Sequence, residues 1–465
     1  MWTLRYQDGT LTVDGASLDA LPMGFVFDDR VGAPRGPAFR YADVVLDAHH
    51  GGQPFTDEAR TWAPLSQLTH RAERVPRSYQ RAALDAWVEN GRRGTVVLPT
   101  GAGKTFVAEL AIATSRRPTL VVAPTLDLVA QWHSRLSTVF GLDCGVLGGG
   151  QHTLADITIS TYDSAYIHLG RYGNRFGLVV WDEVHHLPAP GYLEAARSAM
   201  APFRLGLTAT YDRDDGREML LEDVLGPVVY QVGITDLAGE FLADYETIQV
   251  TVHLSDAERA RYDTCRKEFR DFCTQSHISL GGRNGFQNFL RESARSRAGR
   301  SAYRAYREYK SIAHGTESKL EMVAQILAEE HGRRAIVFTN DNATAFRVSR
   351  QLLLPCITHH TDVKERKAML SAFSEGRLPV LVTSKVLNEG VDMPEAEVAI
   401  VVSGSGTVRE HVQRLGRILR PRAGKRAVLY ELVAADTTEV HASERRRNHA
   451  AYQADDAEES SDAPA

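Results

Sequence analysis

Short apolar runs recur along the chain, and longer stretches with helical spacing separate them. They include TVVLP (95–99), TLVVAP (119–124), GLVVWDE (177–183) and RLGLTAT (204–210), followed by RRAIVFT, PVLVTS and VAIVVSG in the second half. Unbroken runs of β-branched residues joined by segments of crossover length are typical of parallel strands that are buried on both faces. The pattern therefore predicts two α/β domains.

The regions outside these runs have other patterns. Asp8-Gly9 lies between WTLRYQ and TLTV and favours a two-residue hairpin turn, because this dipeptide tolerates positive φ. Between the two sets of runs the spacing is helical, and arginines outnumber acidic residues. We predict a small α+β domain at residues 1–70, α/β domains at 71–243 and 314–440, a basic helical insert at 244–313, and a disordered acidic tail at 441–465.

Composition narrows the class of protein. The 465 residues carry a formal net charge of −5, which argues against a globally basic nucleic-acid coat but allows a local basic face. The four cysteines show no CxxC spacing, so a zinc or redox site of that kind is not indicated. The N-terminus has no signal-peptide pattern and no run of 18 apolar residues occurs, so we expect a soluble cytoplasmic protein without membrane contact.

The segment LPTGAGKT (98–105) follows an apolar run and precedes a helix-forming stretch. Glycines allow backbone N–H groups to curl around a phosphate, and a helix N-terminus adds the positive end of its dipole. The strict P-loop pattern has Gly where this chain has Leu98, and a structural glycine-rich turn is the alternative. We interpret the segment as an ATP site in which Lys104 reaches the β- and γ-phosphates and Thr105 ligates Mg²⁺. The same loop contributes Thr100, Gly101, Ala102 and Gly103.

Two carboxylates end the run GLVVWDE. A nucleotide site needs one carboxylate at a neighbouring strand end to hold Mg²⁺ and a second to orient and deprotonate the attacking water. Asp182 and Glu183 supply these two groups, and His185 would link them to other parts of the core. A zinc site at His185 and His186 is less favoured, because the HExxH spacing is missing.

Five segments, LPTGAGKT, WDEVH, LTAT, VTSKVLNEGVDMP and QRLGRILRP, resemble in this order motifs I, II, III, V and VI of superfamily 2 helicases, over about residues 74–435. Within that superfamily the chain is most similar to the XPB family of DNA helicases. PRSYQ (76–80) resembles the family's adenine-reading segment, RDD (213–215) stands where the family has its RED element, and the basic insert stands where it has its thumb. The N-terminal FDDRVGAPRGPAFRY resembles the segment before the helicase core of prokaryotic XPB-like chains; a connection inside a small domain is the alternative.

The resemblance implies two RecA-like domains that close over one ATP with its Mg²⁺. A planar guanidinium from the opposite domain can then neutralise the γ-phosphate only when the cleft closes. Arg417 and Arg420 are the candidate arginine fingers, and Gln413 can reach toward the same phosphate. By the same resemblance, the other nucleotide contacts are Arg77, Gln80, Gly390 and Asp392, and the residues that couple the site to the rest of the domain are His185, Thr208, Ala209 and Thr210.

Contacts to DNA are also implied by the resemblance. Small and hydroxyl-bearing residues suit sequence-independent contacts to the backbone, arginines give a grip that weakens with salt, and interleaved tyrosines can stack on bases. The insert can equally be a solvated face or a docking surface for a partner protein such as a nuclease. The candidate DNA contacts are Pro124, Thr125, Gln131, Gly148, Gly149, Thr161, Arg213, Asp214, Asp215, Arg297, Arg300, Arg304 and Thr383.

Together these residues favour a monomeric ATP-dependent DNA helicase and double-stranded DNA translocase of the XPB type. Movement from 3′ to 5′ and a role in DNA repair similar to nucleotide excision repair follow from the resemblance alone. Two alternatives stay open: an RNA helicase or restriction-system motor subunit, and a nucleotide-gated DNA clamp that recruits a nuclease. Stimulation of ATP hydrolysis by duplex DNA, single-stranded DNA or RNA separates them.

Overall fold

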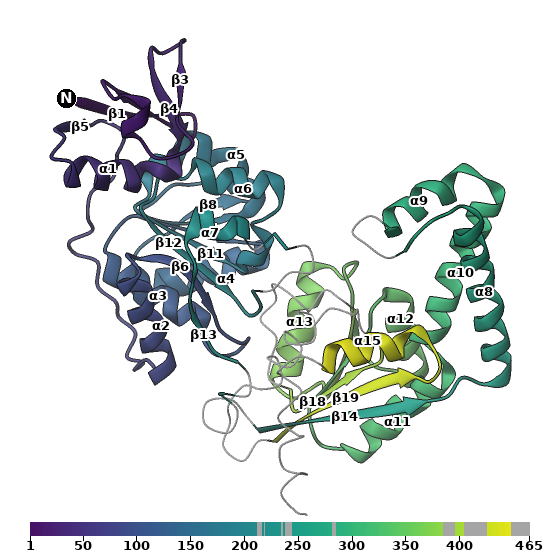
Figure 1. Ribbon diagram of the computed structural model, residues 1–465. Helices are drawn as coiled ribbons and strands as arrows, with labels where there is room; N and C mark the ends of the chain where they lie inside the picture. The colour runs from purple at the N-terminus through teal and green to yellow at the C-terminus, as the bar shows by residue number, and fades with distance from the viewer. Residues whose placement is uncertain are drawn as a thin grey trace, which may run out of the picture. The chain divides into compact units, whose positions relative to one another are not determined.

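The structure, a computed structural model, describes residues 1–211, 216–217, 219–233, 236–237, 244–280, 285–384, 396–403 and 426–447. The chain divides into two compact units (Figure 1). One consists of Met1–Pro99 and Gly103–Val232, and the other consists of Thr100–Ala102 and Gly233–Ala465. Each unit is described by itself below. No helix in the described ranges has the length and apolar content needed to span a membrane.

A five-stranded sheet opens the first unit, in the order β3-β4-β2-β1-β5. Strands β1 (Trp2–Gln7) and β2 (Thr10–Asp14) are antiparallel, and Gln7 pairs with Thr10 across the turn. Asp8 and Gly9 both have positive φ, 45° and 79°, so the predicted two-residue hairpin is confirmed. The remaining elements are β3 (Val26–Asp28), β4 (Ala33–Pro37), α1 (Tyr41–His50) and β5 (Phe55–Asp57).

The larger sheet of the first unit has eight strands in the order β13-β6-β12-β11-β7-β10-β8-β9, and only β9 pairs antiparallel. The strands are β6 (Arg93–Val97), β7 (Thr119–Ala123), β8 (Gly145–Gly148), β9 (Gln151–His152), β10 (Ile157–Thr161), β11 (Leu178–Asp182), β12 (Phe203–Thr208) and β13 (Val228–Gln231). The helices are α2 (Ser78–Glu89), α3 (Lys104–Ser115), α4 (Leu126–Phe140), α5 (Tyr162–Tyr172), α6 (Pro190–Ser198) and α7 (Met219–Leu225).

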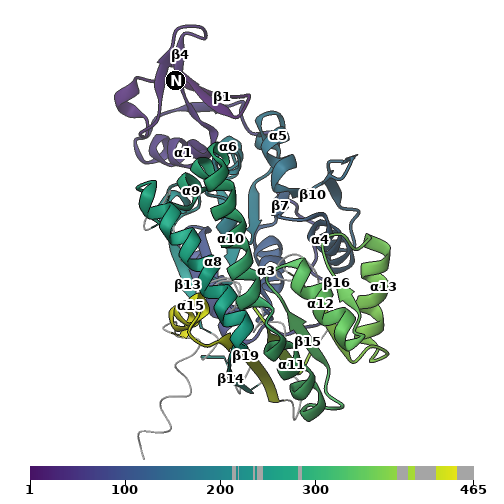
Figure 2. The same cartoon turned by 90° about the vertical axis from the view of Figure 1, so that its right-hand side faces the viewer.

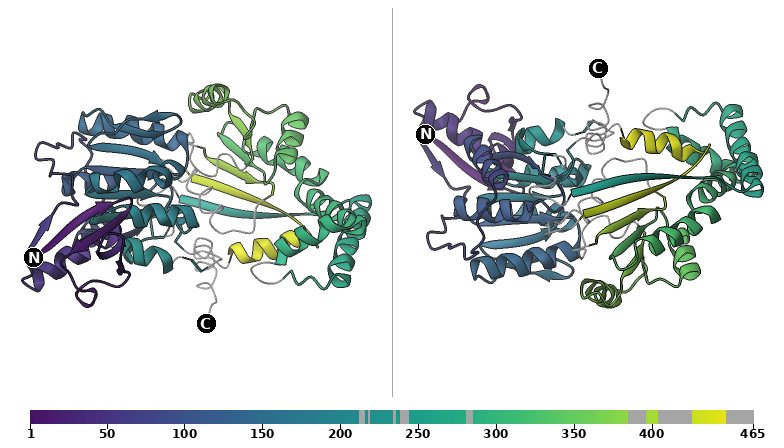
Figure 3. Two further views of the ribbon diagram at one scale, coloured as in Figure 1. Left: turned by 90° about the horizontal axis from the view of Figure 1, so that it is seen from above. Right: turned by 90° about the horizontal axis from the view of Figure 1, so that it is seen from below.

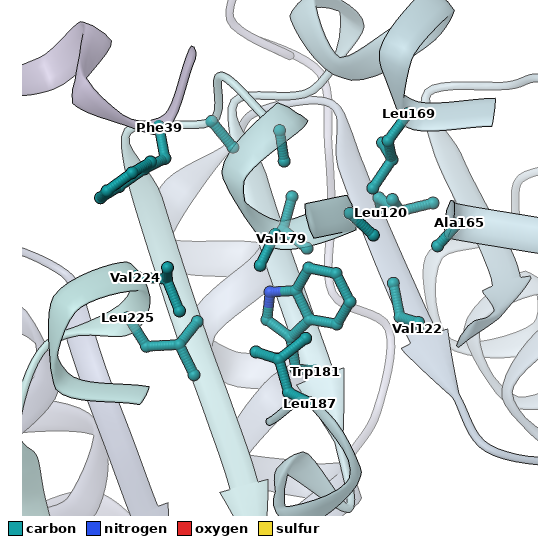
Figure 4. Close-up of a cluster of buried hydrophobic side chains, with 14 of the residues drawn as sticks. Phe39, Leu120, Val122, Ala165, Leu169, Val179, Trp181, Leu187, Val224 and Leu225 are labelled. Carbon is teal, nitrogen blue, oxygen red and sulfur yellow. The ribbon is translucent and has the colours of Figure 1, made fainter. Parts of the chain in front are cut away.

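The core of this sheet forms around Trp181, whose side chain is completely buried. Figure 4 shows its indole ring among Val179, Leu187, Leu120 and Val122. Phe39, which lies between β4 and α1 in the N-terminal part of the chain, belongs to the same cluster. The N-terminal sheet and the eight-stranded sheet are therefore packed together through apolar side chains within one unit.

The second unit contains an all-parallel sheet of six strands in the order β14-β19-β18-β15-β17-β16. The long strands β14 and β19 lie side by side in Figure 3. The strands are β14 (Asp244–Val252), β15 (Ala335–Phe338), β16 (Cys356–Ile357), β17 (Val380–Thr383), β18 (Val398–Val401) and β19 (Arg426–Ala434), and the helices are α11 (Glu317–Glu329), α12 (Asn342–Leu352), α13 (Val363–Ser374) and α15 (Thr438–Arg447).

Two boundaries differ from the sequence prediction. Residues 244–252 were assigned to the helical insert, but they form β14, which pairs with β19 along its whole length. Residues 441–447 were assigned to the disordered tail, but they continue α15. This helix is held by the buried pair of Lys319 and Glu439, whose Nζ and Oε2 lie 2.6 Å apart, and by a hydrogen bond of 3.1 Å from Ser443 to Glu431.

The helical insert consists of α8 (Asp256–Gln275), α9 (Gly285–Arg295) and α10 (Arg297–His314), and Figure 2 shows α8 and α10 side by side. Ser255 and Glu258 form a capping box at the start of α8. Tyr309 lies in the core of the insert, and Tyr303 and Tyr306 are half-buried against it. Tyr309 therefore serves as a packing group, and the prediction that it stacks on bases does not fit its burial. For the partly exposed Tyr303 and Tyr306 base stacking stays a prediction. Ala302, Ala305 and Ala313 share the buried face of α10, which leaves its arginines on the opposite face.

Candidate nucleotide site and candidate DNA contacts

The P-loop segment has the expected strand, loop and helix arrangement. Strand β6 ends at Val97, and α3 begins at Lys104. Gly101 and Gly103 have φ values of 86° and 84°, in the left-handed region that glycine adopts without strain. The ammonium group of Lys104 donates to the Leu98 carbonyl at 3.2 Å, so the lysine side chain folds back over the loop.

The predicted adenine-reading segment lies against this loop. Arg77 is the N-cap residue of α2, and its backbone N–H donates to the Gln80 Oε1 at 3.1 Å. Gln80 is 5% exposed. A Cβ atom on Gly103 would come within 2.5 Å of the Gln80 Nε2, so the glycine leaves room for this amide in its present position. The structure thus brings Arg77 and Gln80 close to the P-loop.

Asp182 ends β11, and both oxygens of its carboxylate are held. The indole N–H of Trp132 donates to Oδ2 at 2.8 Å, and the backbone N–H of Glu183 donates to Oδ1 at 3.0 Å. Burial and, after it, the charge of Glu183 raise the pKa of Asp182 to about 6, while the Trp132 hydrogen bond and the Lys104 ammonium act in the opposite direction. Lys104 and Asp182 are therefore close enough to interact electrostatically.

Glu183 and His185 connect this carboxylate to β12. The Nδ1 atom of His185 lies 3.4 Å from the Glu183 Oε2 and 3.2 Å from the Thr208 Oγ1. The Thr208 hydroxyl donates to the Thr210 carbonyl at 2.8 Å and accepts from the Thr210 N–H at 3.2 Å. Ala209 lies between these threonines and is 9% exposed. Three of the predicted coupling residues, His185, Thr208 and Thr210, thus form one polar chain, and the Glu183 carboxylate lies 3.4 Å from its first member.

The residues present fit a magnesium ion better than an all-protein metal cage. Mg²⁺ is usually bound through one or two carboxylates together with phosphate oxygens. Asp182 offers such a carboxylate, and Thr105 offers a hydroxyl in the first turn of α3. Within the described ranges no group of three or more His, Cys, Asp or Glu side chains could hold a metal ion.

Several predicted DNA contacts from motif-bearing loops meet at one edge of the eight-stranded sheet. Thr125 caps α4, where its hydroxyl accepts from the Leu128 N–H at 3.3 Å, and Thr161 caps α5, where its hydroxyl accepts from the Ser164 N–H at 3.1 Å. A Cβ atom on Gly148 would lie 3.1 Å from the Thr161 Cγ2, so the glycine loop packs against the start of α5. Pro124 precedes Thr125, and Gly149 follows Gly148 with a φ of 59°. Both threonine hydroxyls therefore act as helix caps at this edge.

Other predicted contacts lie elsewhere. Gln131 is half-buried in the second turn of α4, away from the capped end. Thr383 is completely buried and its hydroxyl donates to the Ser384 carbonyl at 2.9 Å, so the predicted contact of this side chain with a DNA backbone does not fit its position. Arg297, Arg300 and Arg304 are exposed on α10. The remaining predicted residues, Arg213, Asp214, Asp215, Gly390, Asp392, Gln413, Arg417 and Arg420, lie outside the described residues.

Two residues that the sequence reasoning missed support Asp182. Trp132 holds one carboxylate oxygen, and the hydroxyl of Tyr162 donates to the Asp182 carbonyl at 2.9 Å. Both are aromatic residues at buried helix positions, so the apolar pattern alone marks them as core. Only the pairing of β11 with β7 in the sheet, and of β7 with β10, brings their helices beside Asp182.

Three family models match the chain. One described as "ERCC3/RAD25/XPB C-terminal helicase" matches residues 312–455, and one described as "Xeroderma pigmentosum group B helicase damage recognition domain" matches residues 4–59. The third, "Type III restriction enzyme, res subunit", matches residues 73–213. The DNA 3′-5′ translocase XPB2 of Sulfurisphaera tokodaii is 39% identical over 444 residues, which are 96% of this chain and 99% of that protein. The chain belongs to the XPB family of DNA helicases.

Longer XPB proteins match over part of their length. The DNA 3′-5′ helicase XPB of Mycobacterium tuberculosis is 33% identical across 81% of this chain and 64% of its own. The general transcription and DNA repair factor IIH helicase/translocase subunit XPB/SSL2 of Saccharomyces cerevisiae is 28% identical across 80% of this chain and 43% of its own. Among solved structures, the Pyrococcus furiosus Hef helicase domain covers 79% of this chain and 98% of its own with a TM-score of 0.51 and 19% identity, which supports the fold. The predicted XPB resemblance and the predicted α/β helicase fold are confirmed.

Proposed function

We propose that this XPB-family chain is an ATP-driven 3′-5′ DNA translocase and helicase that acts in DNA repair. The observation that supports this proposal most directly is the polar chain of His185, Thr208 and Thr210 beside the Glu183 carboxylate. It connects the carboxylate proposed to activate water with the strand end that carries the LTAT motif. Hydrolysis at one end can therefore be sensed at the other, as a DNA motor requires.

Nucleotide binding would use the loop after β6 and the start of α2. The left-handed glycines of the P-loop let backbone N–H groups turn toward the phosphates. Lys104 would leave the Leu98 carbonyl and pair with the β- and γ-phosphates. Gln80 and Arg77 would contact the base and sugar side of the nucleotide, because Gln80 already touches the loop.

Hydrolysis would use the two carboxylates in different roles. Thr105 and Asp182 would hold Mg²⁺, which when bound neutralises charge on the phosphate oxygens. Trp132 fixes the Asp182 carboxylate in place by its indole hydrogen bond. Glu183 would orient the attacking water and take its proton, and His185 limits the positions that Glu183 can adopt.

Residues outside the described ranges would complete the nucleotide site. Arg417 and Arg420 are proposed to stabilise charge on the transferred phosphoryl group, with Gln413 nearby and with Gly390 and Asp392 sensing the nucleotide. Arginine fingers contribute on the order of 10³–10⁵ in rate, so hydrolysis would depend on closure of the two RecA-like domains. Arg213, Asp214 and Asp215 are proposed to act on DNA near strand separation.

DNA would lie along the edge where α4, the glycine loop and α5 begin. Helix N-termini carry partial positive charge and suit phosphate contacts that do not read sequence. In the second unit the exposed arginines of α10 would add an electrostatic grip. We also propose that the chain works as a monomer in the cytoplasm and that the insert α8–α10 can dock a partner nuclease.

The test is the rate of ATP hydrolysis as a function of added duplex DNA, single-stranded DNA or RNA. Duplex DNA should stimulate the rate strongly, and Lys104→Ala should abolish turnover while the circular dichroism spectrum stays that of the unaltered chain. Lys367→Ala, which removes an exposed lysine from α13, is the control and should retain full stimulation. Stimulation by RNA alone would favour an RNA helicase, and no stimulation by any nucleic acid would refute the motor.

A further inference from the structure

A column of alternating arginine and aromatic side chains lies in the first unit, and none of its members is one of the helicase motif residues named above. The guanidinium carbon of Arg60 lies 5.1 Å from the ring centroid of Trp62. The guanidinium carbon of Arg117 lies over two rings, 4.8 Å from the centroid of Trp62 and 3.8 Å from that of Phe203. The guanidinium carbon of Arg92 also lies over Phe203, 5.0 Å from its centroid. Three positive charges are therefore held in a row by two aromatic rings.

The column is part of the folded framework. Arg92 and Arg117 precede β6 and β7, Phe203 begins β12, and Trp62 lies in the segment that follows the N-terminal sheet. A Cβ atom on Gly177 would lie 2.8 Å from the Arg117 Cδ and 3.2 Å from the Trp62 Cε3, so the missing side chain at this position makes room for the stack. The column lies at the amino-terminal ends of the strands, whereas the P-loop follows their carboxyl ends.

Two of the three positive charges of the column, those of Arg92 and Arg117, are not balanced by acidic groups. Among the described residues, no carboxylate lies within ion-pair distance of Arg92 or Arg117, and neither guanidinium donates a hydrogen bond to a protein acceptor. The nearest pairing is that of Arg60 with Asp57, at 3.7 Å. Burial lowers the pKa of Arg117, and the charges of Arg92 and Arg60 lower it further. A bound anion would relieve this repulsion.

The donor groups of the column suit a phosphate. Stacking occupies the faces of a guanidinium and leaves the N–H groups on its edge, which match phosphate oxygens in pairs. The indole N–H of Trp62 is also a donor without an acceptor, although Trp62 is only 8% exposed. Burying such a donor unpaired costs on the order of 1–3 kcal/mol, so its retention points to an acceptor that arrives from outside.

We propose that Arg60, Arg92 and Arg117 form a binding site for successive phosphates of a DNA backbone, separate from the helicase motifs. A row of half-exposed cations fits a linear polyanion better than a single small anion, which binds in an enclosed pocket. The site rests on the proposed function, because it takes DNA as the ligand. It would give the first unit a second contact with DNA at the end of the sheet opposite to the nucleotide.

The experiment measures duplex DNA binding by fluorescence anisotropy at several KCl concentrations, without nucleotide. Arg92→Gln/Arg117→Gln removes both unpaired charges and keeps polar side chains of similar length. Each phosphate contact contributes about 0.9 to the slope of log Kd against log salt, so the slope should fall by about two and Kd at 0.1 M KCl should rise roughly tenfold. The matched control Arg171→Gln/Arg175→Gln alters two exposed arginines of the same unit and should leave both values within twofold of the unaltered chain.

Other results would overturn the site. The first such result is a double variant that is folded by circular dichroism and has the same salt slope and Kd as the unaltered chain. The second is a lower melting temperature without any change in slope, because the column would then only fix the segment around Trp62. If the double variant does not fold, Arg60→Gln replaces it, because the Arg60 side chain is 47% exposed. This single variant should lower the salt slope by about one, and an unchanged slope would overturn the site.

Two further measurements distinguish free phosphate from DNA as the ligand, and distinguish failure of this site from failure of the proposed function. Inorganic phosphate at 10 mM should compete with DNA only weakly. Suppose instead that phosphate raises the melting temperature of the unaltered chain but not of the double variant, and that both bind DNA equally. The site then takes free phosphate and not DNA. If the unaltered chain shows DNA-stimulated ATP hydrolysis and the variant keeps the normal salt slope, only this site fails. If the unaltered chain does not bind DNA at all, the proposed function fails and the site with it.

Discussion

Glu183 has a left-handed backbone conformation, with φ 48° and ψ 54°, that residues other than glycine seldom adopt. Such a conformation costs of order 1–3 kcal/mol and persists where the surroundings fix it. Here the His186 N–H donates to the Glu183 carbonyl at 3.0 Å, and Tyr162 holds the preceding carbonyl. The strain turns the chain sharply after β11 and places the Glu183 side chain beside His185.

Glu183→Gln should lower the turnover number for ATP by about 10²–10⁴, because loss of a general base has this effect. ATP binding and the melting temperature should stay close to those of the unaltered chain, since the amide keeps the shape and the backbone conformation. Steady-state hydrolysis and equilibrium binding of a fluorescent ATP analogue measure the two properties. Glu194→Gln, on an exposed position of α6, should change neither; full turnover in Glu183→Gln would remove this residue from the chemistry.

Thr208→Val should reduce the stimulation of ATP hydrolysis by DNA roughly fivefold or more, a typical size for coupling between sites, and leave the rate without DNA within about twofold. The change removes only the hydroxyl that joins His185 to Thr210. Thr95→Val is a matched control, because Thr95 is also completely buried in the same sheet and its hydroxyl has no partner. Equal stimulation in both variants would show that the polar chain does not transmit the state of the site.

The residues of the candidate site that belong to a motif could be predicted from the sequence. The residues that hold them in position by hydrogen bonds could not. The P-loop lysine and the two carboxylates follow apolar strands at fixed offsets, so their chemistry is readable. Trp132 and Tyr162 have the apolar environment of ordinary core residues, and their hydrogen bonds to Asp182 depend on which strands are neighbours in the sheet. Strand order is a property of the whole sheet and is not encoded in local spacing.

At the scale of elements, the P-loop helix α3 is tied to α4 by a buried ion pair. Glu109 on α3 is completely buried, and the Arg135 Nε on α4 lies 2.6 Å from its carboxylate, with Arg74 and His70 each 3.5 Å from the second oxygen. Burial raises the pKa of Glu109 to about 7 despite these partners. The pair fixes the helix that follows the ATP loop against the helix that begins at Thr125.

Arg135→Ala should lower the free energy of unfolding by about 1–3 kcal/mol at pH 8, because a buried charge loses its nearest partner. The loss should be smaller at pH 5.5. The folded pKa of Glu109 is raised to about 7, so at pH 5.5 the carboxyl group is protonated and neutral in the folded state and Arg135 has no negative charge to pair with. The ion pair, and with it the contribution of Arg135, forms as the pH rises through about 7. Urea unfolding at the two pH values measures it; a loss that is larger at pH 5.5 would contradict the assignment.

Helix α10 offers a test of the insert. Replacing Arg297, Arg300 and Arg304 by alanine should weaken binding to duplex DNA and lower the salt slope by up to about three. On α8 the exposed Arg261, Lys267 and Arg270 alternate with Asp263, Glu268 and Asp271, so the corresponding triple change is a control from the same insert and should have a smaller effect. Anisotropy titrations at several salt concentrations compare them, and equal slopes would favour a protein-docking role for the α10 face.

At the scale of the whole molecule, the two-domain architecture follows from the repeated apolar runs, because each run forms a parallel strand of one of the two larger sheets. The boundaries were harder to predict. Strand β14 has a mixed polar and apolar sequence, DYETIQVTV, and pairs with β19 about 180 residues later, so nothing local separates it from the helices that follow. The helix α15 is likewise fixed by tertiary partners, because Lys319 lies 120 residues before Glu439 and Glu431 belongs to the preceding strand β19.

The most direct measurement is displacement of a labelled triplex-forming strand from a duplex during ATP hydrolysis. The strand should be released in the presence of ATP, with a rate that scales with the rate of hydrolysis, and Glu183→Gln should release none. A single-strand gap placed in either strand of the duplex gives the polarity, for which movement from 3′ to 5′ is expected. Vigorous DNA-stimulated hydrolysis without any release of the third strand would contradict a translocase and leave a clamp in its place.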